Sequence, residues 1–238
     1  MNGTLFLYTL RQRFQQPLRM VLVLAFFGFP LLMVAASRGA TGLMPLSAGS
    51  ALALVLGAGL IGSDSSAGVF QLLFARPVTR AGYVLSRWLA VAAAAGTLGV
   101  LQVLLGAAIL VAFGHAPDAA EVGTRCADQA LSALSVSSLV LLFSTVLPGI
   151  GDVVAVVLGN VASALIAPIA GFARWPWLER LGREVNRFFA PDFAWADVVG
   201  RGDVSWFLLV SWASTIALCV ALAIVVMNRR EVSYASGQ

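Results

Sequence analysis

The chain has 238 residues, of which 60% are hydrophobic and 11% are charged, and its mean hydropathy is +0.91. Soluble domains carry about 25% charged residues, so this composition excludes a soluble globular protein and indicates an integral membrane protein. All 15 basic residues are arginine, and they cluster at the ends of apolar runs, so the net charge of +4 indicates contact with lipid headgroups and not nucleic-acid binding.

The first 18 residues mix apolar and basic side chains at helical spacing. Leucine, phenylalanine and tyrosine residues alternate there with Arg11, Arg13 and three glutamines, and Arg19 follows. This pattern predicts an interfacial helix over 1–18, with Arg11, Arg13 and Arg19 anchored at the membrane surface.

Long windows without charged residues predict the membrane spans. About 20 apolar residues cross a bilayer, and a charged residue at its centre costs roughly 2.5–3.5 kcal/mol on insertion scales. Six windows fit: 20–37, 43–63, 88–114, 129–147, 153–173 and 204–228. The third is long enough to tilt or to break near Gly96 or Gly99, and Pro30 and Pro168 are expected to kink their helices. The fold class predicted is an all-α membrane protein with six transmembrane helices in a single domain, 1–238.

The distribution of arginine predicts the orientation. An even number of spans puts both termini on one side, together with Arg11, Arg13, Arg19, Arg76, Arg80, Arg87, Arg229 and Arg230. The other side has Arg38, Arg125 and five arginines in one long loop. Because arginines in short loops near span ends set the orientation, we expect both termini in the cytoplasm.

A half-polar segment, 63–80, separates the second and third windows. Residues 67–75 form a short amphipathic element, and Asp64 lies near its N-terminal end, where a negative charge complements the helix dipole. Pro77 prevents the helix from continuing past Arg76. The apolar side consists of Val69, Phe70, Leu72, Leu73 and Phe74. This segment is either a surface helix in contact with lipid alone or a surface that binds a partner protein.

The loop at 174–203 contains a second amphipathic pattern. Trp175, Trp177 and five further large apolar residues recur at roughly helical spacing among arginine and glutamate. The pattern predicts one or two short helices at the outer interface, with the two tryptophans as membrane anchors.

The sequence contains no recognisable catalytic or metal-binding pattern. It has one histidine, His115, two widely separated cysteines, Cys126 and Cys219, and no lysine for a phosphate-binding loop. We therefore expect no catalytic residue, no metal and no cofactor on this chain. The polar residues within the windows are expected to join helices by hydrogen bonds; no Asp, Glu or Arg lies mid-window, which argues against an ion-coupled transporter. They are Gln102, Ser132, Ser135, Ser137, Ser138, Ser144, Asn160, Ser163, Ser211 and Ser214.

Residues 64–87 carry a recognisable motif. It reads Asp64-x-x-x-Gly68-x-x-x-Leu72-Leu73-x-x-Arg76-Pro77-Val78-Thr79-Arg80-x-x-Tyr83-x-Leu85-x-Arg87. This motif resembles the signature of type-two ATP-binding-cassette exporter permeases, in which a glutamate usually stands at the place of Asp64, serine at Thr79 and lysine at Arg87. The six windows, the basic N-terminal helix and the long loop before the last window also resemble that family.

The resemblance implies a permease subunit, an exporter, in a bacterial or archaeal cytoplasmic membrane. Residues 67–75 would be a coupling helix that docks on a separate ATPase subunit, and ATP and magnesium would bind to that ATPase and not to this chain. A second permease protomer, identical or related, would complete the unit. The coupling interface implied consists of Asp64, Gly68, Phe70, Leu72, Leu73, Phe74, Arg76, Pro77 and Arg80, and Arg87 joins the surface anchors.

Two other functions stay open at this point. The extended loop 174–203 also suits a membrane subunit that relays ATPase motion to a partner on the outer face without transporting a substrate. An intramembrane enzyme is disfavoured because the windows contain no paired carboxylates and no nucleophile–base pair.

Overall fold

The structure of the chain is a computed structural model that describes residues 3–66, 79–172, 175–189, 195 and 206–229. Every regular element within these residues is a helix, which confirms the all-α prediction for this part of the chain. The helices are α1 (Gly3–Phe14), α2 (Pro17–Ala36), α3 (Ala48–Gly57), α4 (Gly62–Ser66), α6 (Arg80–Ala112), α7 (Ala119–Val146), α8 (Gly151–Phe172), α9 (Pro176–Phe189) and α11 (Trp206–Arg229).

Five of these helices, α2, α6, α7, α8 and α11, are long and apolar enough to cross a membrane. Helices satisfy their own backbone hydrogen bonds, which is what the interior of a bilayer requires. Large apolar side chains on α2, α6, α8 and α11 are exposed, as expected where lipid is the solvent. The chain is thus a multi-pass membrane protein by helix length and composition.

The second window, 43–63, differs from the uninterrupted span that was expected. Helix α3 has 10 residues and α4 has 5, and the backbone between them leaves the helical path. Ten residues rise about 15 Å, half of the roughly 30 Å of a hydrocarbon core. In place of six uninterrupted spans, the described residues contain five long helices and this short, interrupted one.

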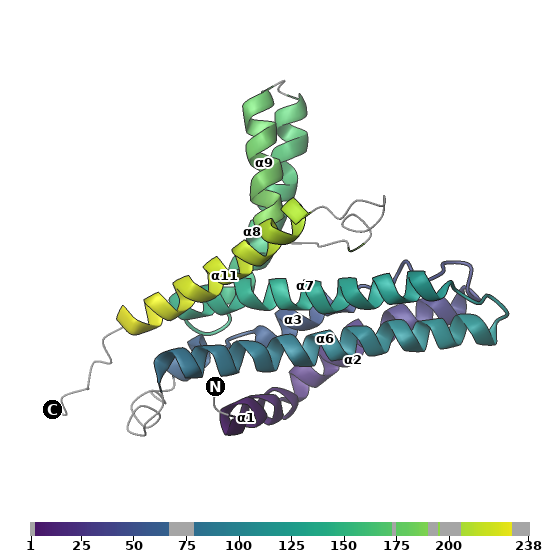
Figure 1. Cartoon of the computed structure of the whole chain (residues 1–238), viewed down its shortest axis with the longest axis horizontal. Helices are drawn as coiled ribbons and strands as arrows, with labels where there is room; N and C mark the ends of the chain where they lie inside the picture. The colour runs from purple at the N-terminus through teal and green to yellow at the C-terminus, as the bar shows by residue number, and fades with distance from the viewer. Residues whose placement is uncertain (1–2, 67–78, 173–174, 190–194, 196–205, 230–238) are drawn as a thin grey trace.

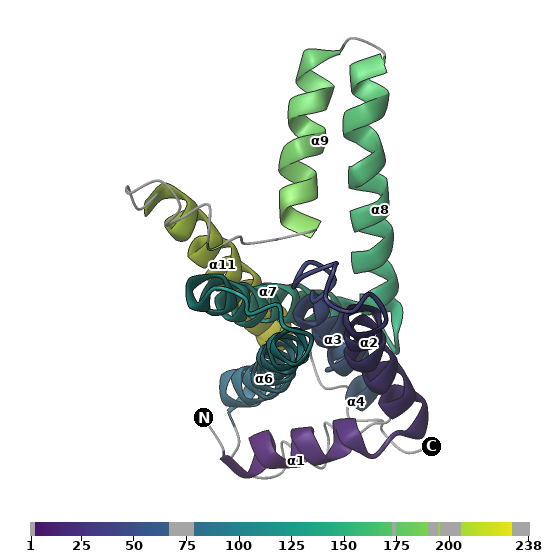
Figure 2. The ribbon, with the colours of Figure 1, turned by 90° about the vertical axis from the view of Figure 1, so that its right-hand side faces the viewer.

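The long helices α6 and α7 lie side by side, α3 packs against both, and α2 packs against α3 and α6 (Figure 1). Helix α11 packs obliquely on α7, and buried side chains of α3, α6, α7 and α11 form the main core. The hairpin of α8 and α9 projects away from this bundle at a steep angle in both views (Figures 1 and 2). Helix α1 lies across the bundle, as Figure 2 shows by viewing α6 and α7 end-on.

Helix α6 begins at Arg80, earlier than the window that started at residue 88, because the Thr79 hydroxyl caps it by accepting a hydrogen bond from the Gly82 amide at 3.2 Å. It continues without a break through Gly96 and Gly99. A Cβ atom on Gly99 would lie 3.0 Å from the Cβ of Gln129 and 3.2 Å from the Cα of Gly49. This glycine therefore allows α3 and α7 to approach α6 closely, and it does not break the helix.

Two buried glutamines tie the beginning of α3 to its neighbours. Gln129 of α7 accepts from the Gly49 amide at 2.7 Å and donates to the Leu46 carbonyl at 3.1 Å. Gln102 of α6 accepts from the Ala48 amide at 3.3 Å and donates to two carbonyls of α2. One of these belongs to Phe26, whose helical partner would be the amide that Pro30 lacks. For Gln102, the contacts agree with the predicted role of joining helices.

Replacing Gln129 by leucine is expected to lower the stability of the protein. The change leaves the Gly49 amide and the Leu46 carbonyl buried without this partner, at a cost of about 1–3 kcal/mol for each group. Thermal unfolding in detergent would measure the loss, with Gln15→Leu at the exposed α1–α2 junction as the matched control. Equal unfolding temperatures for the two variants would contradict this account.

Candidate functional site

The candidate site consists of the described residues that flank 67–78 in the sequence. Most of the expected coupling interface, consisting of Gly68, Phe70, Leu72, Leu73, Phe74, Arg76 and Pro77, lies outside the described residues. Asp64, in α4, and Arg80, the first residue of α6, lie within them and flank the segment on its two sides. The contacts of these two flanks therefore define the site.

A buried cluster joins the two flanks. Asp64 of α4 forms an ion pair with Arg87 of α6, and it also accepts a hydrogen bond from the Tyr83 hydroxyl at 2.5 Å. Asp64 is 5% exposed, Arg87 4% and Tyr83 0%. The guanidinium of Arg87 donates to Gln12 of α1 at 2.9 Å and lies 5.4 Å from the centre of the Tyr83 ring. We call these four residues, Asp64, Tyr83, Arg87 and Gln12, the base cluster.

Arg80 connects the start of α6 to the end of α11. Its guanidinium donates to the carbonyls of Met227 at 3.0 Å and Asn228 at 2.9 Å. The last carbonyls of a helix have no partner inside it and carry partial negative charge, so an arginine is favourable there. Together with the base cluster, this contact links the flanks of residues 67–78 to α1 and α11.

Residues 58–61, which we call the α3–α4 break, lie next to the base cluster and are held by two arginines. Arg13 of α1 donates to the carbonyls of Ala58 at 2.6 Å and Gly59 at 3.1 Å. Arg19 of α2 also donates to the Ala58 carbonyl, at 3.0 Å. A break between two buried helices frees backbone groups that need such partners.

Two further side chains satisfy the amides of this region. Asp152, at the start of α8, accepts from the Gly59 amide at 2.8 Å and is fully buried. Ser144, near the end of α7, accepts from the Ile61 amide at 2.7 Å and from the Gly62 amide at 3.0 Å. Side chains from α1, α2, α7 and α8 thus meet at one short stretch of backbone.

Glycine is required at two positions here. Gly59 has φ +64°, in the left-handed region that costs other residues roughly 1–2 kcal/mol. A Cβ atom on Gly62 would lie 2.6 Å from the Leu147 carbonyl oxygen, in the turn between α7 and α8. The break therefore packs directly against this turn.

The electrostatics of the site are dominated by arginine. Burial, followed by repulsion from Arg19 and Arg87, lowers the pKa of Arg13 to about 9, so the side chain remains charged at neutral pH. The Nε atoms of Arg13 and Arg87 are buried and have no hydrogen-bond partner among the described residues. Asp64 is the acid that is paired with an arginine in the base cluster. Asp64 therefore places a counter-charge beside Arg87 in this arginine-rich site.

The arginines and tryptophans expected at the membrane surface divide into two groups. Arg11 is exposed, as are Trp175 and Trp177, whose rings stack with their centres 6.5 Å apart. Arg13 and Arg87, by contrast, are 3% and 4% exposed and bind protein groups, because the α3–α4 break and Asp64 supply acceptors that lipid headgroups would otherwise provide. Arg19 is half-buried.

The sequence did not identify Gln12 or Asp152 as members of the site. It identified Ser144 as a polar residue but not its contacts with the Ile61 and Gly62 amides. The one signal for Asp152 was an acidic residue directly before a long apolar window, and nothing in the sequence gave its partner, which is 93 positions away. No group of three or more potential metal ligands occurs within the described ranges.

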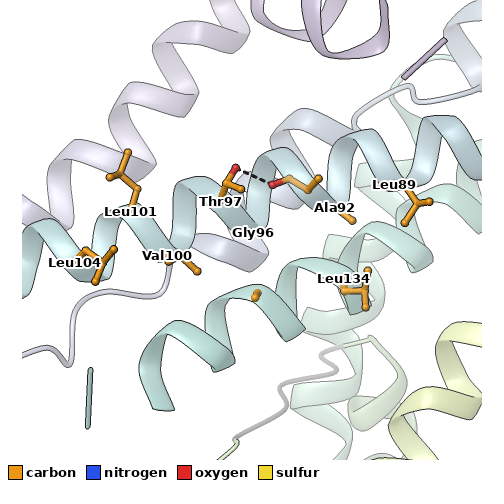
Figure 3. Close-up of a pocket in the computed structure, with 10 residues that line it drawn as sticks. Leu89, Ala92, Gly96, Thr97, Val100, Leu101, Leu104 and Leu134 are labelled. Atoms are coloured by element: carbon orange, nitrogen blue, oxygen red, sulfur yellow. Dashed lines mark hydrogen bonds between the residues drawn. The ribbon is translucent and has the colours of Figure 1, made fainter. Parts of the chain in front are cut away.

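An apolar groove lies on the surface formed by α6 and α7, with a volume of about 540 Å³ (Figure 3). Its one side-chain hydroxyl, that of Thr97, donates to carbonyls of its own helix, including that of Ala93 at 2.8 Å. The groove can accommodate apolar groups and offers no charge to orient a polar molecule. It is lined by Leu89, Ala92, Ala93, Gly96, Thr97, Val100, Leu101, Leu104, Ala130 and Leu134.

Breaking the buried ion pair is expected to be far more harmful than breaking an exposed one. Asp64→Asn leaves Arg87 buried without a counter-charge, which costs about 3–5 kcal/mol. Glu179→Gln breaks the exposed pair with Arg183 and should cost about 0–1 kcal/mol. The double replacement Asp64→Leu with Arg87→Met removes both charges and should be less destabilising than Asp64→Asn. Thermal unfolding of the variants tests this order, and a double variant less stable than Asp64→Asn would contradict it.

Adding one methyl group to Gly62 or to Gly123 should have opposite effects. Gly62→Ala places its Cβ atom against the Leu147 carbonyl and should lower stability. Gly123 lies inside α7 with nothing within 4 Å of the added atom, so Gly123→Ala should raise stability by up to about 1 kcal/mol through helix propensity. Unfolding temperatures in one detergent would compare them; a neutral Gly62→Ala would show that the α7–α8 turn yields easily.

A scan against protein-family models finds none that matches this chain, and a search among curated proteins finds no match to its sequence.

Proposed function

We propose that this chain is the membrane-spanning permease subunit of an ATP-binding-cassette transporter of the exporter type. Residues 67–75 bind a groove on a separate ATPase subunit and transmit its motion to the helices. ATP and magnesium bind to that ATPase. Two copies of the permease, or this chain and a related one, assemble with two ATPases in a bacterial or archaeal cytoplasmic membrane.

The observation that carries the proposal is the buried set of polar contacts that joins the two flanks of residues 67–78. Asp64 on one side binds Arg87 and Tyr83 on the other, and all three are buried. A loop that only joined two spans would need no buried ion pair, because surface turns are satisfied by water. A segment that receives force needs a base that does not deform, and the base cluster provides one.

The connections of the base indicate how force would spread. Arg87 reaches Gln12 of α1, and Arg80 reaches the end of α11. A displacement of residues 67–75 would then move α4, α6, α1 and α11 together. The mechanism that follows is closure of the ATPase dimer on ATP, a shift of each docked segment, and a rocking of the helices that changes access to the transported molecule.

The proposal includes six membrane crossings with both termini in the cytoplasm. The interrupted α3–α4 element acts as the second crossing, with Ala48–Asp64 as its apolar stretch. Helix α1, which lies across the bundle (Figure 2), acts as the interfacial helix. Helix α9, the amphipathic helix that pairs with α8, acts at the outer face.

Placing a carboxylate on the apolar side of residues 67–75 is expected to abolish coupling. Phe70→Asp would bury an unpaired charge in the ATPase groove, so the ATP hydrolysis that co-purifies with the tagged full-length chain should fall more than about tenfold. Leu181→Asp, on an exposed apolar position of α9, is the matched control and should retain the activity.

Both variants must insert in the membrane at the level of the unmodified chain for the comparison to count. Undiminished ATP hydrolysis in Phe70→Asp would overturn the docking role of residues 67–75. Hydrolysis absent from the unmodified chain purified from its native membranes would overturn the ATPase partnership.

A further inference from the structure

We propose that the α3–α4 break is a joint that couples the position of α8 to residues 67–78, with Asp152 and Arg13 as its two positioning residues. This inference rests on the proposed function, because it assigns the residues through which the coupling segment would move α8.

Side chains from two different helices form hydrogen bonds with the same residue of the break, Gly59. The Gly59 amide donates to Asp152 of α8 at 2.8 Å, and the Gly59 carbonyl accepts from Arg13 of α1 at 3.1 Å. Both side chains are buried, with exposed fractions of 0% and 3%. Charged groups form hydrogen bonds roughly twice as strong as neutral ones, so both helices are firmly attached to this peptide.

The route from the joint to residues 67–78 is short. Helix α4 begins at Gly62, three residues after Gly59. It ends at Ser66, directly before residues 67–78. Ser144 fixes the intervening backbone through the amides of Ile61 and Gly62. A displacement of the segment therefore reaches Gly59 through one turn of helix.

Helix α8 is the element best suited to respond. The α8–α9 hairpin projects from the bundle, and α8 packs mainly on α9 rather than on the core helices (Figures 1 and 2). At its N-terminal end Asp152 bonds to Gly59 and also accepts from its own Val153 amide at 2.8 Å. A movement of Gly59 would therefore act on the N-terminal end of α8.

Asp118 provides a direct comparison for Asp152. It caps the start of α7 by accepting from the Ala120 amide, and it is exposed. Asp152 is the second residue of α8, where it accepts from the Val153 amide and makes the additional bond to Gly59. Asp118→Ala is therefore the control for losing an aspartate at the start of a helix without losing a bond to Gly59.

The test measures whether each positioning residue acts across the joint. The full chain is studied in lipid nanodiscs without any ATPase, so its outcome is independent of the proposed partner. In the first arm, hydrogen exchange of residues 67–78 is followed in Asp152→Ala and in Asp118→Ala. We expect exchange to be about tenfold faster or more in Asp152→Ala, as for the loss of a charge-assisted hydrogen bond, and unchanged in Asp118→Ala.

In the second arm, spin labels on Leu165 of α8 and Val111 of α6, both exposed, report the position of α8. Cys126 and Cys219 are replaced first. The hydrogen bonds that Arg13 donates within the described residues go to Ala58 and Gly59 and not to α8. Arg13→Ala should nevertheless broaden or shift the distance distribution, while Arg11→Ala, exposed on the same helix, should not.

If Arg13 only stabilised the break, Arg13→Ala would not change the distance between Leu165 of α8 and Val111 of α6. If Asp152→Ala alters exchange only in the first turn of α8, or if Arg13→Ala leaves the α8 distances unchanged, the joint is overturned. If both arms behave as expected while Phe70→Asp retains ATP hydrolysis, the joint stands and the docking role of residues 67–75 fails.

Discussion

The structure depends on finding hydrogen-bond partners for the two ends of α3. Any helix leaves about four amides and four carbonyls unpaired at its ends, and in a bilayer there is no water to satisfy them. In this protein, both ends of a short helix lie inside the bundle. Gln102 and Gln129 accept hydrogen bonds from the amides at its start. Arg13 and Asp152 form hydrogen bonds with the backbone that follows its end.

These hydrogen bonds help to determine which helices pack against one another. Gln102 joins α6 to α2 and α3, and Gln129 joins α7 to α3. Apolar packing in lipid supplies little specificity, because lipid tails are as apolar as the helices. The helix arrangement is therefore specified by a few amide side chains and by glycines such as Gly99 that let the backbones come close.

The sequence predicted the long helices well because their signal is local. Apolar length alone identifies α2 and α11, whose ends lie within a few residues of the windows 20–37 and 204–228. The break between α3 and α4 could not be predicted in this way, since its backbone is stabilised by Arg13 and Asp152, which are 45 to 93 positions away.

The candidate site was predictable in type and only partly in detail. Residues 63–80 stood out by their polarity and by their position between the second and third apolar windows, and the motif that begins at Asp64 overlaps them. Arg11 and Arg13 are the same residue type two positions apart, and only tertiary contacts distinguish the exposed one from the buried one. Gln12 could not be recognised, because its role as an acceptor for Arg87 exists only once α1 crosses the bundle.

The α3–α4 break also has a consequence for how the chain is made. Membrane helices enter the bilayer in order of synthesis, and the backbone of Gly59 emerges long before its partner Asp152. Until α8 begins to leave the ribosome, this amide must be satisfied by water at the membrane surface. The α3–α4 break can therefore form its final contacts only after more than half of the polypeptide has been translated, which makes the arrival of α8 a late step in the assembly of this site.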